Sequence, residues 1–182
     1  MPLTVLALGA AMRGGARPTF LMFPDWGGAP PLGWLAPWTP TPFLTVDGRF
    51  GSAEHHFMHG KALLFGDQAI AEKILRAPMS GQARELGRRV RGFQEDVWLC
   101  ERKRLMDDAN LAKFRALPEL GSYLRATWPA VLVQASALDT VWGSGLDLED
   151  PFLRSPGQWP GQNLVGFSLM KVREDLRAAA EG

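Results

Sequence analysis

The chain has 182 residues, of which 46% are hydrophobic and 21% are charged, and these values are typical of one globular domain with a substantial core. Its 20 basic and 19 acidic residues leave a formal charge of +1, which excludes a global field that would recruit nucleic acid or an anionic membrane. No run reaches the ~20 apolar residues that a membrane span needs. The single cysteine, Cys100, excludes an internal disulfide framework, so we expect a packed thiol and a reducing, cytoplasmic setting.

The first twelve residues, Met1 to Met12, are mostly apolar but have no basic leader, because the first arginine is Arg13. We therefore expect a buried strand or a loose terminus here. We assign residues 1–18 to a variable or flexible N-terminus and residues 19–182 to one compact domain.

The next segments predict strands around a structured loop. Residues 19–23 form an apolar run that Pro24 ends, and residues 24–42 are too rich in proline and glycine for regular structure, although their tryptophans indicate packing. Residues 43–46 and 49–50 flank Asp47-Gly48, which predicts a hairpin. The hairpin leads into a helix over residues 52–67.

Helices dominate the remainder, so the predicted fold is α+β and predominantly helical, with a small sheet. Asp67 and Ser80 are the expected N-caps of two helices that end before Pro78 and near Val90. Further helices are predicted over residues 94–116, 118–123 and 163–180, and a short strand over residues 131–133. A loop rich in glycine and aspartate covers residues 137–160.

The helix after Ser52 carries charges on its apolar side. At about 100° per residue, Phe57 and Lys61 fall within about 80° of Glu54. Burying a charge without a partner costs several kcal/mol, roughly, so either these two residues pair at the edge of the core or they line a pocket that shifts their pKa values. The same helix bears His55, His56 and His59, which we interpret as solvent-facing or rim residues rather than as metal ligands, because no third ligand is evident.

Two other polar stretches rich in tryptophan lie far along the sequence: Trp98 with Arg102, and Asp139 to Gly145. Two carboxylates, a lysine and indoles suit cleavage at an anomeric carbon. The carboxylates can stabilise an oxocarbenium-like transition state and activate water, while a tryptophan stacks on a base or sugar. We expect Glu54, Lys61, Trp98, Asp139 and Trp142 to share one pocket without a metal or another cofactor.

Taken in order, these landmarks resemble the NADAR or YbiA-like family. The resemblance covers about residues 20–176, and the matching segments are Leu35–Trp38, Val46–Gly48, Ala53–His55 with Lys61-Ala62, Ala83–Arg88, Trp98, Asn110–Phe114, Pro118–Leu120, Val133–Ser136, Asp139–Gly145 and Trp159–Gly166. It implies a compact, mostly helical α+β domain that hydrolyses N-glycosidic bonds of ribose. Relatives act on phosphoribosylated intermediates of riboflavin synthesis, and others remove ADP-ribose from guanine.

By motif, Glu54, Asp139, Trp98 and Trp142 match the family's active-site positions, and Lys61 matches a lysine proposed to act with the glutamate in the ADP-ribose branch. Further substrate contacts are expected from Arg102, Trp38, Gly143 and Asn163. Each assignment has a structural alternative: Asp139 can cap a turn, Trp98 can belong to the core, Arg102 can pair with Glu54, and Asn163 can cap a helix.

Two departures from the family pattern concern the substrate. Pro37 stands where many members have Asn or Gln, and Phe57-Met58 stands where many have Tyr-Gln. The leading hypothesis is an N-glycosidase that acts on a small phosphoribosylamino-pyrimidine. The alternatives are removal of ADP-ribose from guanine in nucleic acid, helped by Arg84, Arg88, Arg89 and Arg91, and a non-catalytic module that binds NAD or ADP-ribose.

The chemistry expected of Lys61 also has two forms. A neutral amine in an apolar wall can attack an opened ribose at C1′ and form a Schiff base, with Glu54 shuttling protons. Alternatively, a protonated Lys61 binds a phosphate or ribose oxygen while Glu54 and Asp139 activate water.

Overall fold

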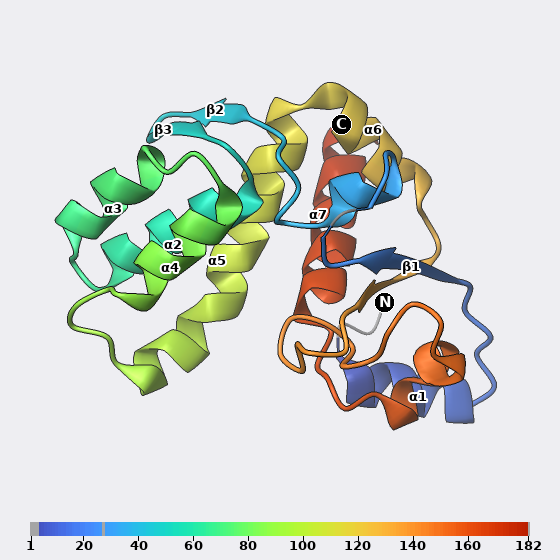
Figure 1. Cartoon of the computed structure of the whole chain (residues 1–182). Helices are drawn as coiled ribbons and strands as arrows, with labels where there is room; N and C mark the ends of the chain where they lie inside the picture. Colours follow the sequence, from blue (N-terminus) through green and yellow to red (C-terminus); the bar gives the residue numbers. More distant parts are fainter. Residues whose placement is uncertain (1–3, 27, 182) are drawn as a thin grey trace. The chain divides into compact units, whose positions relative to one another are not determined.

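The computed structural model describes residues 4–26 and 28–181, and the chain forms two compact units. The first unit comprises Met1–Ala36 with Glu119–Gly182, and the second is Pro37–Pro118. The two units are described separately, and their elements are labelled in Figure 1. Helices predominate over two small two-stranded sheets in the described ranges, which confirms the predicted α+β, mostly helical class.

The first unit is built on a parallel strand pair, β1 (Phe20–Pro24) and β4 (Val131–Ala135). The register runs from Phe20 opposite Val131 to Pro24 opposite Ala135, so both strands end at the same edge. Every residue of β4 is buried, including the apolar residues 131–133 that predicted the strand and the polar Gln134. The long helix α7 (Leu164–Glu181) packs on β4 (Figure 1), and α6 (Pro118–Ala126) precedes that strand.

The chain before β1 forms helix α1 (Val5–Arg13), which packs against the short 3₁₀ turn η3 (Pro156–Gln158). The expectation of a strand or a loose terminus is therefore wrong from Thr4 onward, and residues 1–3 lie outside the described ranges. The Thr4 hydroxyl caps the helix by accepting a hydrogen bond from the Ala7 amide at 3.1 Å. Two further 3₁₀ turns, η1 (Leu32–Leu35) and η2 (Pro151–Arg154), lie in the loops that we expected to be irregular.

The second unit surrounds helix α2 (Ala53–Leu64), which contacts each of its neighbouring helices. These are α3 (Gln68–Leu75), α4 (Ser80–Arg88) and α5 (Glu95–Ala116). The hairpin of β2 (Phe43–Thr45) and β3 (Gly48–Phe50) forms as Asp47-Gly48 predicts, with Gly48 at a φ of 135°. It delivers the chain to Ser52, the cap of α2.

Close packing of α4 on α2 depends on Gly87. A Cβ at this position would lie 2.2 Å from Sδ of Met58 and 3.0 Å from its Cγ. Glycine at position 87 therefore leaves room for the Met58 side chain and lets α4 approach α2 closely.

Three local expectations are corrected by the structure. Ser80 lies inside α4, and its cap residue is Met79, so the Ser80 hydroxyl is free to bond elsewhere. Cys100 is exposed on α5 rather than packed. His55 and His59 are buried, and His56 is half-buried. The hairpin rings of Phe43 and Phe50 pack against His56 and His59, whereas His55 is hydrogen-bonded to Ser52 and Ala77.

Candidate active site

Helix α2 presents Glu54 and Lys61 two turns apart. Glu54 is 4% exposed, and its backbone amide donates a hydrogen bond to the Pro37 carbonyl at 3.0 Å. The Ser52 hydroxyl accepts from the His55 amide at 3.4 Å and so satisfies a donor in the first turn. The backbone that carries Glu54 is thus fixed both by the helix cap and by the loop before the hairpin. The expectation that this carboxylate lies on the buried side of the helix is confirmed.

A chain of side-chain contacts links the start of α2 to α4. His55 Nδ1 lies 2.8 Å from Ser52 Oγ, which lies 2.9 Å from Ser80 Oγ, and Ser80 donates to the Trp38 carbonyl at 2.9 Å. His55 Nε2 donates to the Ala77 carbonyl at 3.1 Å. Burial lowers the pKa of His55, although the hydrogen bond to Ala77 opposes this, so the neutral ring with its proton on Nε2 is the form expected at neutral pH. These contacts of His55 fix the first turn of α2, which also carries Glu54.

Lys61 lies between two aromatic rings. Its Nζ is 4.7 Å from the ring centre of Phe93 and 4.9 Å from that of Trp98. Burial lowers the pKa of Lys61, and the nearby positive charge of Arg88 lowers it further. The ring faces stabilise the protonated ammonium form of Lys61, whereas burial and Arg88 favour its neutral amine form. An amine with a lowered pKa is the state that a nucleophilic lysine requires.

Trp98 is held by its neighbours, since its ring centre lies 5.4 Å from that of Phe57 and 6.4 Å from that of Phe93. It is half-buried, which leaves part of the indole accessible. Arg102 is also half-buried and follows Trp98 by one turn of α5. Trp38 is covered on one face by the Arg84 guanidinium, 5.2 Å from its ring centre. The second unit therefore contains Glu54, Lys61 and three of the expected substrate contacts.

The first unit contains the loop that begins at Asp139. Oδ1 of Asp139 accepts hydrogen bonds from the amides of Val141 at 2.9 Å and of Trp142 at 2.7 Å. The interpretation of Asp139 as a turn cap is therefore confirmed. This use of Oδ1 leaves Oδ2 as the oxygen that could act on a substrate. Trp142 is half-buried and directly follows the capped turn.

Asn163 ties this loop to the sheet. Its side-chain amide donates to the Leu132 carbonyl and accepts from the Gln134 amide, both at 2.9 Å, and its backbone has a φ of 52°. Its carbonyl also accepts from the Phe167 amide at 3.1 Å, in the first turn of α7. Because Asn163 is fully buried, its principal role is structural, and a contact with substrate stays a prediction.

Two glycines complete the packing of the loop. A Cβ at Gly161 would lie 2.3 Å from the Gly143 carbonyl oxygen, and a Cβ at Gly143 would lie 3.0 Å from the Asp139 carbonyl oxygen. The Gly161 amide donates to the Ser144 carbonyl at 2.8 Å. Gly143 is therefore required for close backbone packing, whether or not it also contacts a substrate.

The structure brings the expected residues together in two groups, one in each unit. Glu54, Lys61 and Trp98 belong to the second, and Asp139 and Trp142 belong to the first. That all five act on one substrate stays a prediction.

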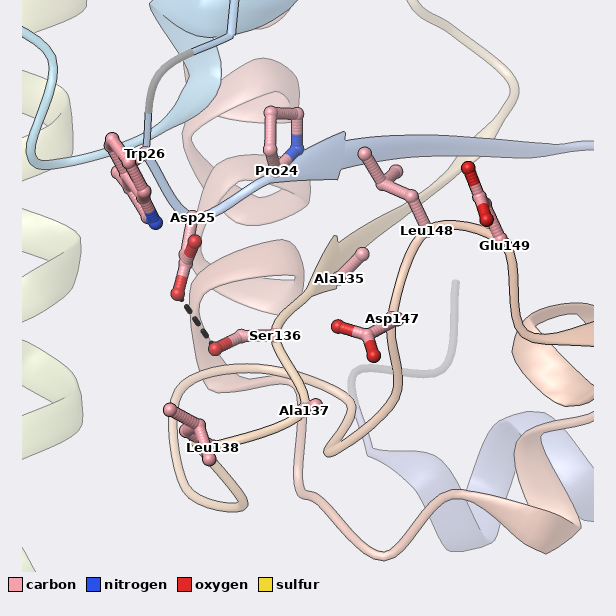
Figure 2. Close-up of a pocket in the computed structure, with 10 residues that line it drawn as sticks. All are labelled: Pro24, Asp25, Trp26, Ala135, Ser136, Ala137, Leu138, Asp147, Leu148 and Glu149. Atoms are coloured by element: carbon pink, nitrogen blue, oxygen red, sulfur yellow. Dashed lines mark hydrogen bonds between the residues drawn. The ribbon is translucent and has the colours of Figure 1, made fainter.

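Sequence reasoning missed Phe93, which contacts Lys61 from the turn before α5, where no periodic pattern marks it. It also missed a cavity of about 520 Å³ in the first unit, shown in Figure 2. The cavity is lined by Pro24, Asp25, Trp26, Ala135, Ser136, Ala137, Leu138, Asp147, Leu148 and Glu149. Its two sides come from segments more than 100 residues apart in sequence, so no local signal could have found it.

No group of three or more His, Cys, Asp or Glu side chains is arranged to hold a metal ion within residues 4–26 and 28–181. The expectation of catalysis without a metal or cofactor stays a prediction. In the same part of the chain, none of the helices combines the length and the apolar character that a membrane crossing requires.

Comparison with known proteins identifies the family. The model of the NADAR domain matches residues 26–177. N-glycosidase R617 of Acanthamoeba polyphaga mimivirus is 38% identical over 124 residues, which cover 68% of this chain and 73% of that protein. N-glycosidase YbiA of Escherichia coli (strain K12) is 33% identical over 134 residues, which cover 73% of this chain and 75% of that protein.

The NMR structure of the E. coli protein YbiA superimposes with a TM-score of 0.71 and 26% identity, covering 99% of this chain and 95% of that one. A third relative, riboflavin biosynthesis protein VVA0006 of Vibrio vulnificus (strain YJ016), is 33% identical over 149 residues, which cover 81% of this chain but 36% of that protein. The resemblance inferred from the sequence motifs is confirmed: the chain belongs to the NADAR domain family.

Proposed function

We propose that this protein is an N-glycosidase that hydrolyses the N-glycosidic bond between ribose and a heterocyclic base. The observation that carries the proposal is the arrangement of α2, where a buried Glu54 and a half-buried Lys61 amine in contact with the rings of Phe93 and Trp98 lie two turns apart. Two turns separate their backbones by about 10 Å, a gap that a ribose can bridge. The relatives R617 and YbiA are named N-glycosidases, which supports the same reaction class here.

The lowered pKa of Lys61 supports a covalent route. Glu54 in its protonated form gives a proton to the ribose ring oxygen, the ring opens, and C1′ becomes an iminium of the base nitrogen. The free Lys61 amine adds to C1′, Glu54 carries one proton of that amine to the base nitrogen, and the base leaves, which gives a protonated lysine Schiff base. Water then adds to C1′, one of its protons passes through Glu54 to the lysine nitrogen, and the lysine leaves as the free amine while the last proton stays on Glu54. The net reaction consumes one water and releases the free base and ribose.

Trp98 and Trp142 would hold the substrate by stacking, and Asp139 would direct water through Oδ2, because Oδ1 already bonds two amides. In this scheme Arg102 and Trp38 bind the outer parts of the substrate, and Gly143 and Asn163 keep the Asp139 loop in place.

The specific substrate that we propose is a phosphoribosylamino-pyrimidine of riboflavin biosynthesis. The relative VVA0006 is named a riboflavin biosynthesis protein, although this chain spans only about a third of its length. A small substrate also agrees with the near-neutral charge of the chain. A reducing, cytoplasmic place of action remains our expectation.

Removal of ADP-ribose from guanine in nucleic acid is less well supported. The proposed basic ridge is partly neutralised, because Arg88 forms an ion pair with Glu85 and Arg91 forms one with Asp67 at 2.8 Å. Arg84 lies over Trp38 instead of extending into solvent. A local ridge with fewer free charges gains less from counterion release, so a small molecule is the better candidate.

The test is a panel of phosphoribosylated and ribosylated heterocycles together with ADP-ribosylated guanine, with released bases identified by mass spectrometry. Glu54→Gln should abolish release, because it removes the proton shuttle, whereas Glu72→Gln on the exposed side of α3 should not. Release from ADP-ribosylated guanine alone would select the second substrate. If the intact protein releases no base but binds NAD or ADP-ribose, it is the non-catalytic module and the proposal fails.

A further inference from the structure

The Lys61 nitrogen lies between two aromatic rings that come from different segments. Its Nζ is 4.9 Å from the ring centre of Trp98 on α5 and 4.7 Å from that of Phe93, in the turn between α4 and α5. Both distances are within the ~6 Å at which the face of an aromatic ring attracts a cation. The planes of the two rings are 56° apart, so the rings flank the nitrogen instead of stacking on one another. We call this pair of rings the aromatic cage.

The turn that carries Phe93 is tied to the chain that follows α2. The Asp67 carboxylate accepts three hydrogen bonds from Arg91, one from Nη2 at 2.8 Å and two from the backbone amide and Nε, each at 3.0 Å. Gly92, with a φ of 71°, then turns the chain, and the Phe93 ring packs on Phe65 with 5.2 Å between the ring centres. Phe93 is nevertheless 45% exposed, so core packing alone does not account for a ring that is fixed at this position.

The charge on Lys61 changes during the proposed route. Burial and the positive charge of Arg88 lower the pKa of Lys61, which favours the free amine that attacks C1′. When the bond from Nζ to C1′ has formed and the bond from C1′ to the base has broken, Glu54 has carried one amine proton to the base. Nζ is then part of a protonated imine and has a full positive charge. A ring face attracts this cation but not the neutral amine, so the aromatic cage acts when the charge forms.

The charged groups around Lys61 do not supply the same stabilisation. Lys61 forms no ion pair with a carboxylate within residues 4–26 and 28–181. Arg88, which is paired with Glu85, opposes a positive charge on Nζ. The elements packed against α2 also carry Arg49 on β3, Glu72 and Lys73 on α3, and Glu95, Glu101 and Arg102 on α5. Because Glu54 moves protons in the proposed route, the two rings are left to stabilise the cation.

We propose that Phe93 is a catalytic residue, which together with Trp98 stabilises the positive charge on Nζ while Lys61 is joined to C1′ of the ribose. Asp67 and Arg91 are positioning residues, because they fix the turn that holds the Phe93 ring. The inference rests on the proposed function for the ribose intermediate. The stabilisation of a cation on Lys61 does not depend on which substrate is cleaved.

Fluorinated phenylalanine at position 93 tests the inference, because fluorine withdraws electron density from the ring face with little change of shape. The full chain with mono-, di- or trifluorinated phenylalanine at this position is incubated with glycolaldehyde and cyanoborohydride. The aldehyde condenses with a free amine to an imine and water, and cyanoborohydride gives hydride to the protonated imine, which leaves a secondary amine. Mass spectrometry of the peptide that contains Lys61 measures the adduct.

At a pH above the pKa of Lys61, adduct formation on Lys61 should fall about two- to tenfold along the series, because only the iminium loses the ring contact. At a pH below that pKa the ammonium and the iminium lose the same contact, so the yield should change little. The exposed Lys73 is the internal control. The same fluorinated series at Phe152, which is 47% exposed and does not contact Lys61, is the matched control. Equal trapping along the Phe93 series would overturn the inference. A loss of the same size at both pH values would also overturn it, since a ring that only shapes access acts at both.

Base release from a ribosylated substrate should show the same dependence on fluorine and pH, and the two proposals can fail separately. If trapping depends on fluorine but no ribosylated compound releases its base, the N-glycosidase is refuted and the stabilisation of a cation on Lys61 stands. If base is released and Lys61→Arg is inactive, but release does not change along the Phe93 series, the catalytic role of Phe93 alone is refuted.

Discussion

Replacement of Asn163 by alanine should destabilise the protein, because it removes both hydrogen bonds that this side chain makes to the β4 backbone. The Leu132 carbonyl and the Gln134 amide would lose partners that lie at 2.9 Å, in a place where Asn163 itself is fully buried. Leaving a buried polar group unsatisfied costs about 1–3 kcal/mol, so the pair costs about 2–6 kcal/mol.

The backbone adds a second cost. Asn163 has a φ of 52°, and asparagine tolerates this left-handed conformation better than alanine, by about 1 kcal/mol. Water entering the space left by the amide would recover part of the hydrogen-bond cost. The expected loss is therefore about 3–5 kcal/mol of unfolding free energy, a large share of the ~5–15 kcal/mol typical of proteins.

Urea unfolding followed by tryptophan fluorescence measures this loss. Asn163→Asp keeps an acceptor for the Gln134 amide but sets a buried carboxylate oxygen against the Leu132 carbonyl, so its loss should be at least as large as that of Asn163→Ala. Asn163→Gly should be more stable than Asn163→Ala only by the backbone cost of about 1 kcal/mol, because glycine also lacks the hydrogen bonds. Gln162→Ala, at an exposed neighbouring position, should change the unfolding free energy by less than about 0.5 kcal/mol.

The structural role of Asn163 would be contradicted if the unfolding free energy of Asn163→Ala lay within about 0.5 kcal/mol of that of the unmodified chain. If that variant also raised KM for a cleaved substrate, Asn163 would contact substrate and would not hold the loop on β4.

Three further predictions concern packing and protonation. The side-chain and backbone N–H groups of Arg91 donate to the Asp67 carboxylate and lower its pKa. The stability from this contact is therefore present above the usual aspartate pKa and is lost as pH falls. Arg91→Gln should raise the pH midpoint of acid unfolding. Burial lowers the pKa of Lys113 to about 7, so between that pH and about 10 the chain takes up a proton when it unfolds. The unfolding free energy should therefore rise with pH in this range. Lys113→Met should flatten the dependence of unfolding free energy on pH, as measured by denaturant titrations. Gly87→Ala should lower the unfolding free energy by about 1–3 kcal/mol by crowding Met58. The double variant Gly87→Ala with Met58→Ala should lose less than the sum of the two single losses, because the smaller side chain removes the clash, and additive losses would contradict the packing argument.

The sequence was most informative where one local rule decides the structure. The period of the apolar residues placed α2 correctly, Asp67 caps α3 as expected, and Asp47-Gly48 formed the predicted turn. The continuous apolar run of β4 indicated a buried strand, and the structure extends it by two residues to Ala135. Glu54 and Lys61 were found because charges on an apolar stripe contradict the usual pattern.

The sequence was least informative where distant segments meet. The first residues were read as strand or coil, but the Thr4 cap and contacts with η3 stabilise a helix. The histidines of α2 were interpreted as solvent-facing or rim residues, because the rings that cover His56 and His59 belong to the hairpin. The Ser136–Asp25 bond joins residues 111 positions apart, and no local pattern could have shown it.

Borohydride trapping tests the central claim most directly, because the proposed route makes Lys61 a covalent nucleophile. Reduction during turnover of a phosphoribosylated substrate should leave one ribosyl adduct on the peptide that contains Lys61, as read by mass spectrometry. Lys61→Arg should give neither adduct nor turnover, while Lys73→Arg, an exposed position on α3, should give both. Continued turnover in Lys61→Arg, with no adduct on the unmodified chain, would show that Lys61 acts as a bound cation and that water attacks directly.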